Sequence, residues 1–473
     1  MTNSIGPCVH STTYDRSSCE IGVVHLGYGA FHRAHQAVYL DDYMEHTNDL
    51  RWGIAAVNLR AEESRDFAQN NSANNGYILK SVAPDGAAKL RRVRAHLSYL
   101  DWSENQSSAE ALLALPSVHI VTITVTESGY YGDASGLLDP QNKTVVAELA
   151  GGKKQSVYAY LTAGLDLRRS KLNQPISILC CDNIQQNGKK LRKNLMAYLE
   201  LAGLTELAEW VDHNVTFPCS MVDRITPRAT DDMRNQIETV LGKQAVPPVM
   251  AEEFVQWVLE RDFAGPVPQL DKVGVTIADD VDPYEEAKIR ILNGGHTCLT
   301  YLAALKGIKT FDAAMRDPEL HEHFWGYETE EVLVGLTRDL PFDKSAYLAD
   351  IAARFGNQAI GDTIARICTD GVAKFPIFIR PTLAGCLKQG KMPLYGIRSV
   401  ASWFVFAKQV AAGRIPFPYV EPSWAKLVQM LEDPTKDSFV NSKELWGDLP
   451  ETYPEFALTL RASIEEAEKK WLV

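Results

Sequence analysis

Short apolar runs alternate with amphipathic segments through the first part of the chain. The runs richest in β-branched residues predict strands at Gly22–Leu26, Trp52–Leu59, His119–Thr126, Ile176–Cys181 and Val273–Asp279. Helical periodicity between them predicts helices at Arg33–Met44, Ser156–Arg169 and Lys189–Ala202. Strands that alternate with helices are typical of a parallel sheet covered by helices, so we expect an α/β domain.

One interruption of this alternation has the pattern of a β-hairpin. Tyr77–Val82 and Leu90–His96 flank Pro84-Asp85-Gly86, which is a cluster of turn-forming residues. Two strand-like runs joined by such a cluster predict an antiparallel pair inserted into the α/β unit.

The pattern changes at about Asp282, where strand-like runs become rare. Helical periodicity then covers Tyr284–Leu305, Lys344–Phe355, Ala359–Asp370 and Pro454–Trp471. We therefore expect an α/β domain over residues 1–281 and a mainly α-helical domain over 282–473.

Composition narrows the class of protein. The chain has 473 residues, of which 45% are apolar and 23% charged, as in ordinary globular proteins. A net charge of −12 disfavours binding to a phosphate backbone, so we expect no nucleic-acid partner. No apolar stretch reaches the roughly 18 residues that a bilayer requires, and the first residues lack the apolar core of a secretory signal. We expect a cytoplasmic protein that does not enter a membrane.

The segment Gly27-Tyr28-Gly29-Ala30-Phe31-His32 follows the first predicted strand and precedes a predicted helix. This is the context of a dinucleotide-binding turn, in which Gly27 allows the tight turn and Gly29 lets the backbone approach a pyrophosphate. His32 occupies the position of the usual third glycine. An ordinary strand-to-helix turn fits this pattern equally well.

The second predicted strand leads into Arg60, Glu62 and Glu63, where such folds recognise the adenosine ribose. A carboxylate at this place favours NAD, whereas Arg60 would accept the 2′-phosphate of NADP. A solvated loop is the alternative. We expect NAD as the cofactor, with NADP not excluded.

The residues best suited to catalysis lie between Tyr284 and His296. On a regular helix Glu285 would neighbour Lys288 and Asn293 would neighbour His296, while Gly294-Gly295 predicts a break or a close ligand approach. A desolvated lysine takes a hydroxyl proton and an amide stabilises an alkoxide. The competing interpretation is an exposed charged face over a satisfied histidine.

The spacing Lys288-x4-Asn293-x2-His296, together with the Gly27–His35 segment, resembles the polyol-specific long-chain dehydrogenases. The resemblance extends from about Ile21 to Pro381 and includes Thr124–Glu127, Cys181–Ile184, Met221–Ile225 and Phe254–Glu260. It implies a Rossmann-type N-terminal domain, a helical C-terminal domain, no metal, and NAD(P)-dependent interconversion of a polyol and its ketose, of the mannitol/fructose or arabinitol/xylulose type.

The resemblance also implies residue roles. Lys288 matches the general acid–base, Asn183 and Asn293 the oxyanion-stabilising amides, His296 the substrate-orienting imidazole, and Glu285 a carboxylate that relays protons. Substrate contacts fall to Arg366, Lys374 and Asp223, although Asp223 is alternatively an ion-pair partner of Arg224. Cofactor contacts fall to Gly27, Gly29, Ala30, Phe31, Arg33, Glu62 and Thr126.

Other activities stay open at this point. Tyr284-x3-Lys288 matches the dyad of short-chain dehydrogenases, but those chains are about half as long and begin with a different glycine pattern. Zinc alcohol dehydrogenases need a Cys/His/Glu ligand set, and no C-x-x-C pair occurs here. Within the resemblance, a sugar-acid reductase of the fructuronate or tagaturonate type is the alternative, and a non-catalytic nucleotide-binding protein is a second one.

Overall fold

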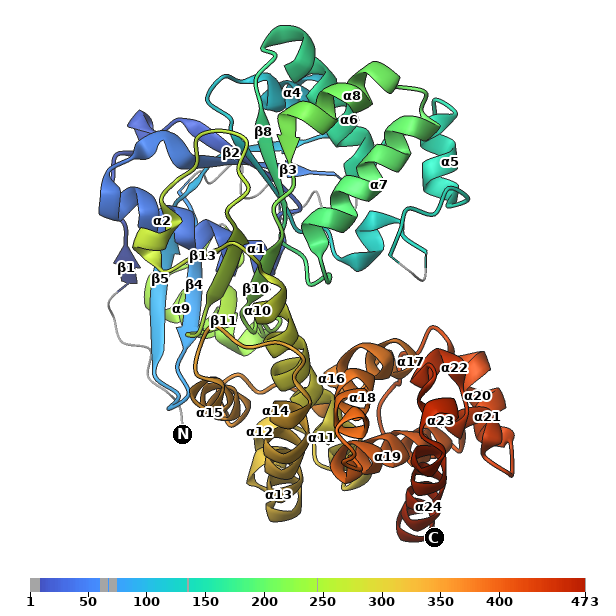
Figure 1. Ribbon diagram of the computed structural model, residues 1–473. Coiled ribbons are helices and arrows are strands. Elements are labelled where there is room, and N and C mark those ends of the chain that lie inside the picture. The colour runs from blue at the N-terminus through green and yellow to red at the C-terminus, as the bar shows by residue number, and fades with distance from the viewer. Residues whose placement is uncertain (1–8, 60–66, 68–74, 134–135, 245, 473) are drawn as a thin grey trace. The chain divides into compact units, whose positions relative to one another are not determined.

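The computed structural model describes residues 9–59, 67, 75–133, 136–244 and 246–472 (Figure 1). The chain forms two compact units. The first comprises the chain before Pro84 and Ala87–Val281, and the second comprises Asp282–Val473 together with Pro84–Gly86.

A six-stranded sheet is the centre of the first unit. Its strand order is β6-β3-β2-β7-β8-β9, and every neighbouring pair is parallel. The strands are β2 (Ile21–Leu26), β3 (Gly53–Asn58), β6 (His96–Asp101), β7 (Ile120–Ile123), β8 (Ile176–Cys180) and β9 (Val215–Thr216). This order corresponds to the 3-2-1-4-5-6 arrangement of a Rossmann fold, so the predicted α/β class is confirmed.

Helices cover both faces of this sheet, and the alternation of side chains along β2 shows how. Val24 and Leu26 belong to one apolar cluster with residues of α6 and α7, while Val23 packs on the opposite face with residues of α2. The helices of this unit are α1 (Ala30–Ala34), α2 (Gln36–Thr47), α4 (Gln106–Ala111), α5 (Lys143–Leu149), α6 (Val157–Lys171), α7 (Asn187–Leu201), α8 (Thr205–Asn214) and α9 (Asp231–Leu241).

The predicted hairpin is confirmed. β4 (Tyr77–Val82) and β5 (Ala88–Val93) are antiparallel neighbours in a four-stranded sheet that also contains β1 (Val9–Ser11) and β11 (Val249–Glu252). A third sheet consists of β10 (Ser220–Asp223), β12 (Gln256–Glu260) and β13 (Thr276–Ala278). The strand predicted at Val273–Asp279 is shorter than expected, because Leu270–Val273 forms a 3₁₀ turn.

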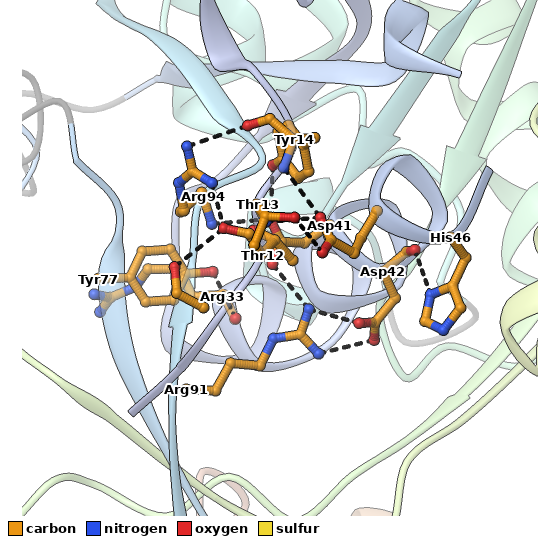
Figure 2. Close-up of polar contacts among 12 residues, drawn as sticks. Thr12, Thr13, Tyr14, Arg33, Asp41, Asp42, His46, Tyr77, Arg91 and Arg94 are labelled. Carbon is orange, nitrogen blue, oxygen red and sulfur yellow. Dashed lines mark hydrogen bonds and ion pairs between the residues drawn. The ribbon is translucent and has the colours of Figure 1, made fainter. Parts of the chain in front are cut away.

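The buried carboxylate of Asp41 fastens the N-terminal segment to α2 and β5 (Figure 2). Its oxygens accept hydrogen bonds from the Tyr14 hydroxyl at 2.7 Å, from Arg91 at 2.8 Å and from the Arg94 amide at 3.0 Å. The Arg94 guanidinium in turn donates to the Thr12 carbonyl. Because a buried carboxylate needs several donors to offset its lost hydration, this network fixes how the segment joins the unit.

The second unit is a helical bundle, as predicted. Its long helices are α11 (Gly294–Leu305), α15 (Lys344–Phe355), α19 (Leu394–Ala411) and α24 (Pro454–Trp471), and α19 packs against both α11 and α24. The shorter helices are α10 (Asp282–Ala287), α12 (Phe311–Arg316), α13 (Pro318–Gly326), α14 (Leu333–Gly335), α16 (Ile364–Ile367), α17 (Gly371–Lys374), α18 (Arg380–Lys388), α20 (Trp424–Glu432), α21 (Asp437–Val440), α22 (Lys443–Trp446) and α23 (Leu449–Thr452).

Three segments of this unit are π-helices, namely η7 (Lys288–Asn293), η8 (Tyr327–Val332) and η9 (Phe375–Ile379). Each continues directly from one α-helical segment into the next. π-turns are rare and occur frequently at functional sites. No helix among the described residues is long and apolar enough to cross a membrane.

The helix predicted at Ala359–Asp370 is mostly wrong. Only Ile364–Ile367 is helical, because the Thr363 side chain accepts a hydrogen bond from the Arg366 amide and starts a new helix there. Thr363 caps the helix in the middle of the predicted segment, so the apolar periodicity of the sequence does not correspond to one continuous helix.

Three buried histidines pack where α1 meets the sheet. The rings of His25 and His32 stack with their centroids 3.3 Å apart, and Nε2 of His32 lies 3.0 Å from Nε2 of His96. Flat rings allow the close approach of helix and strand that a third glycine usually permits. Burial lowers the pKa of His25 to about 3 and lowers the pKa values of His32 and His96 well below 6.5.

These lowered pKa values predict that stability falls in mild acid. An unfolded histidine binds a proton near pH 6.5, whereas the three folded imidazoles stay neutral. Below that pH the unfolded state therefore binds more protons, and these three rings together lower the free energy of unfolding by up to about 4 kcal/mol per pH unit. Urea unfolding between about pH 7 and about pH 5 measures this slope.

The slope, rather than the stability itself, is the informative quantity. His96→Gln removes one titrating ring and should reduce the slope by about one proton. His46→Gln is the matched control, because it makes the same replacement at an exposed histidine of α2. Equal slopes for wild type and His96→Gln would contradict the explanation.

Candidate active site

The turn after β2 has the geometry that the glycine pattern predicts. Gly27 has a φ of +92°, and a Cβ on it would lie 2.0 Å from the Thr124 carbonyl oxygen, so a side chain is excluded there. Gly29 precedes α1, and a Cβ on it would meet nothing within 4 Å. Gly29 and Ala30 are exposed, so the backbone is accessible where the helix begins.

The side chains of His25 and Thr124 fix the conformation of this turn by hydrogen bonds to its backbone. The Gly27 carbonyl accepts hydrogen bonds from His25 Nε2 at 2.7 Å and from Thr124 Oγ1 at 2.9 Å. His25 Nε2 must then carry the proton, and Nδ1 accepts from the Thr122 hydroxyl at 2.8 Å. The neutral tautomer is thus fixed by its surroundings.

The structure places Phe31 and Arg33 just behind the turn. Phe31 is half-buried and stacks on His35, with ring centroids 5.0 Å apart. Arg33 is buried, donates to the Pro247 carbonyl at 3.1 Å and lies over the Tyr28 and Tyr77 rings. Its guanidinium therefore connects α1 to the segment at Pro247 and to two aromatic rings. Arg60, Glu62 and Glu63 lie outside the described residues.

Two further predicted residues follow the adjacent strands of the same sheet. Thr126 comes after β7 and Asn183 after β8, and both are exposed. Carboxyl ends of parallel strands meet at one edge, where ligands bind in open α/β sheets. The strand order reverses between β2 and β7, so this edge is the expected crevice.

Asp223 lies at the end of β10 and is buried. The neighbouring Arg224 donates to the carbonyls of Glu252, at 2.8 and 2.9 Å, and of Ala34, at 2.5 Å. These contacts use all three nitrogens of its guanidinium. The guanidinium of Arg224 thus links β10 to the backbone at Glu252 and at Ala34.

In the second unit, Glu285, Lys288, Asn293 and His296 lie on one uninterrupted helix formed by α10, η7 and α11. Glu285 is 7% exposed, Lys288 8% and Arg290 2%. The alternative interpretation of an exposed charged face is therefore wrong. Arg290 is satisfied by Glu286, Thr382 and the Gly335 carbonyl.

The π-turn changes which of these residues share a side of the helix. In a regular α-helix, Lys288 and Asn293 would be about 140° apart. Here the Gly294 amide donates to the Ile289 carbonyl, five residues earlier. The i to i+5 pattern brings residues five apart onto one side, so the ammonium and the amide share a face that a 3.6-residue period separates.

The predicted break at Gly294-Gly295 is wrong, because the helix continues through both residues. The two glycines permit close packing within the protein. A Cβ on Gly295 would lie 2.6 Å from Oε1 of Glu328, and one on Gly294 would lie 3.1 Å from the Tyr327 hydroxyl. The helix that carries Lys288 thus lies directly against the π-helix η8.

His296 is held between two aromatic rings. Its ring stacks on Phe355 at 4.0 Å and meets the edge of Phe311 at 4.6 Å. Burial is the main cause that lowers the pKa of His296, with a smaller opposing effect from Asp362. The imidazole is therefore neutral at pH 7 and has one donor and one acceptor.

Arg366 and Lys374 are close enough to His296 to lower its pKa. Arg366 forms a two-pronged ion pair with Asp362, in which Nε donates to Oδ1 at 2.5 Å and Nη2 donates to Oδ2. Lys374 donates to the Ile367 carbonyl and the Thr369 hydroxyl, both at 2.9 Å, and burial lowers its pKa. The structure thus gathers the predicted cations of this unit around one imidazole.

One carboxyl group in each unit escaped the sequence interpretation. Glu328 is fully buried on η8, and burial raises its pKa well above 4.5. Asp182, between β8 and Asn183, accepts hydrogen bonds from two backbone amides just beyond β7. The sequence beside a motif does not show which partners a carboxylate has, so only the fold identifies these two groups.

Two family profiles cover most of the chain. The mannitol dehydrogenase Rossmann domain matches residues 21–272, and the mannitol dehydrogenase C-terminal domain matches residues 280–467. The chain belongs to the mannitol dehydrogenase family.

Relatives from this family are similar over nearly their whole length. D-arabinitol 4-dehydrogenase of Ralstonia nicotianae is 36% identical, over 90% of this chain and 92% of that protein. Mannitol 2-dehydrogenase of Cereibacter sphaeroides is 34% identical, over 95% of both. Among solved structures, the Pseudomonas fluorescens mannitol 2-dehydrogenase ternary complex with NAD and D-mannitol is 32% identical, with a TM-score of 0.85 over 98% of this chain and 94% of that one.

The family assignment agrees with the arrangement of strands and helices, since these alignments include both units. Among the residues described here, no group of three or more His, Cys, Asp or Glu side chains is placed to hold a metal ion.

The packing of Gly295 generates a prediction. Gly295→Ala forces a methyl group into Glu328 and Phe324, so we expect a loss of about 1–3 kcal/mol in stability and a clear loss of oxidoreductase turnover. Gly356→Ala is the matched control, because Gly356 has a negative φ and its neighbours stand 3.6 Å from the added Cβ. Thermal unfolding compares the variants, and equal stability would contradict the close packing.

Proposed function

We propose that the protein is an NAD(P)-dependent oxidoreductase that interconverts a polyol and its ketose by hydride transfer. Family membership supports the reaction class, and relatives named arabinitol and mannitol dehydrogenases support the substrate class. The observation that carries the mechanism is the burial of Lys288 on a π-turn that aligns it with Asn293. A lysine desolvated in this way is suited to proton transfer.

The residues of the first unit fit a dinucleotide. The open backbone at Gly29 and Ala30, the tight turn at Gly27 and the strand end at Thr126 would hold it. When bound, the nicotinamide ring supplies the hydride acceptor for oxidation and the donor for reduction. A neighbour crystallised with NAD supports NAD as the first choice, and NADP is the second.

In the oxidative direction, Nζ of Lys288 takes the proton of the reacting hydroxyl as its carbon loses a hydride. Asn293 would donate an amide N–H to the developing alkoxide, and Asn183 matches the second oxyanion-stabilising amide of the family. The neutral His296 would orient a neighbouring hydroxyl through its single donor and acceptor. Glu285, buried three residues before Lys288, would pass the proton toward solvent.

The arrangement at Arg366 favours a polyol over a sugar acid. A carboxylate substrate would be bound best by both prongs of a guanidinium. Here Nε and Nη2 of Arg366 both already donate hydrogen bonds to the Asp362 carboxylate. Lys374 and His296 then offer single hydrogen bonds, which suit a chain of hydroxyl groups. A fructuronate or tagaturonate reductase remains the second candidate within the family.

The test of the acid–base role is Lys288→Ala. We expect turnover to fall by about 10²–10⁴ or more, with NADH affinity within about twofold of wild type. Lys344→Ala is the control, because Lys344 is exposed at the start of α15. Added primary amines should restore part of the Lys288→Ala rate. A variant that keeps a tenth of the wild-type rate would remove Lys288 from the mechanism.

The test of the substrate class compares steady-state efficiencies. Mannitol, arabinitol and sorbitol should far exceed 2-butanol, because a buried donor left without its hydroxyl costs about 1–3 kcal/mol. Fructose and fructuronate reduction are then compared at equal cofactor. A hundredfold preference for fructuronate would establish the sugar-acid alternative, and binding of NADH without turnover of any of these compounds would favour a non-catalytic protein.

A further inference from the structure

The Asp182 carboxylate joins the ends of two neighbouring strands of the Rossmann sheet. It lies two residues beyond β8, and its oxygens accept hydrogen bonds from the Val125 amide at 2.9 Å and the Thr126 amide at 3.2 Å, both just beyond β7. The Tyr130 hydroxyl donates a further bond at 2.7 Å. One carboxylate thus collects donors from three residues of the loop that follows β7.

Thr126 adopts a backbone conformation that threonine normally avoids. Its φ is +66° and its ψ is 162°, which is a region that is essentially reserved for glycine. A β-branched side chain makes the conformation still less favourable. Such a residue persists only where its surroundings hold it, and here the bond from its own amide to Asp182 is the evident restraint.

The strained residue Thr126 lies at the edge of the sheet where a nucleotide is expected to bind. Thr126 is exposed at the carboxyl end of β7, next to β2 and its glycine turn, where the order of strands reverses. Asn183 directly follows Asp182 in the chain. One side chain therefore fixes both the exposed loop at the nucleotide edge and the start of the segment that carries the amide.

We propose that Asp182 is a positioning residue that holds the Val125–Thr126 turn in its strained conformation and thereby sets the nicotinamide end of the cofactor site and the position of Asn183. The inference rests on the proposed function. A carboxylate suits this role because it accepts several N–H and O–H bonds and donates none. An amide at the same position would turn an NH₂ group toward one of the donors.

The experiment measures NADH affinity by fluorescence titration, without substrate, and thermal stability in parallel. Asp182→Asn should raise the Kd of NADH at least tenfold and lower turnover further. Tyr130→Phe is the matched control, because it removes one bond to the same carboxylate and leaves both backbone amides bound. Its Kd should stay within twofold of wild type, although its stability also falls.

A rescue variant distinguishes positioning from a general loss of structure. Glycine adopts the Thr126 conformation without strain, so the turn would depend less on its restraint. In a Thr126→Gly background, Asp182→Asn should therefore raise the Kd of NADH by less than a third of the factor seen in the parent. Asp182→Glu serves as a second probe if Asp182→Asn does not fold, and it should raise the Kd because its longer side chain displaces the amides.

The outcomes separate the two levels of the proposal. If the wild-type chain binds neither NADH nor NADPH, the proposed function fails. If it binds NADH and Asp182→Asn binds within twofold of it, only the positioning role is overturned. An undiminished effect in the Thr126→Gly background would likewise overturn it, since the restraint on the strained turn would not be what Asp182 provides.

Discussion

Burial of polar groups is the constraint on which both halves of this protein depend. In the first unit the buried carboxylate of Asp41 and the buried imidazole of His25 are each surrounded by donors or acceptors that fix one conformation, and the half-buried carboxylate of Asp182 is held in the same way. In the second unit the same constraint applies to Lys288 and Arg290. Removing a charge from water is costly, so a sequence keeps such groups only where the fold provides partners or where chemistry needs the altered environment.

The parallel sheet was predictable because its signal is local and repeated. Strands buried on both faces are mostly apolar along their length, and β2, β3, β7 and β8 all have this composition. The hairpin followed from a turn cluster between two such runs. Helices α15 and α24 were predicted with the observed bounds, because each has one clear apolar side and a definite start.

The parts that sequence could not supply have a different physical origin. Helix α19 is buried on most of its surface, so its sequence lacks the amphipathic contrast that identifies a helix. The π-turns break the 3.6-residue period, and the pairing of Glu285 with Lys288 and of Asn293 with His296 assumed that period. The role of Gly295 depends on Glu328, which is far away in sequence. For the site, residue types were within reach of the sequence, whereas their burial and partners were set by tertiary packing.

The π-turn between Lys288 and Asn293 also bears on how this segment evolves. Insertions are usually accommodated in the loops between helices. In this segment the π-turn accommodates one additional residue within the helix itself. Deleting one residue between the two would restore a regular α-helix, in which residues four apart also share a face, so the amide would stay on the side of the ammonium. The shared face is therefore compatible with two lengths: five residues with a π-turn, or four residues without one. An active relative with a one-residue gap between these two positions should have a regular α-helix in place of the π-turn.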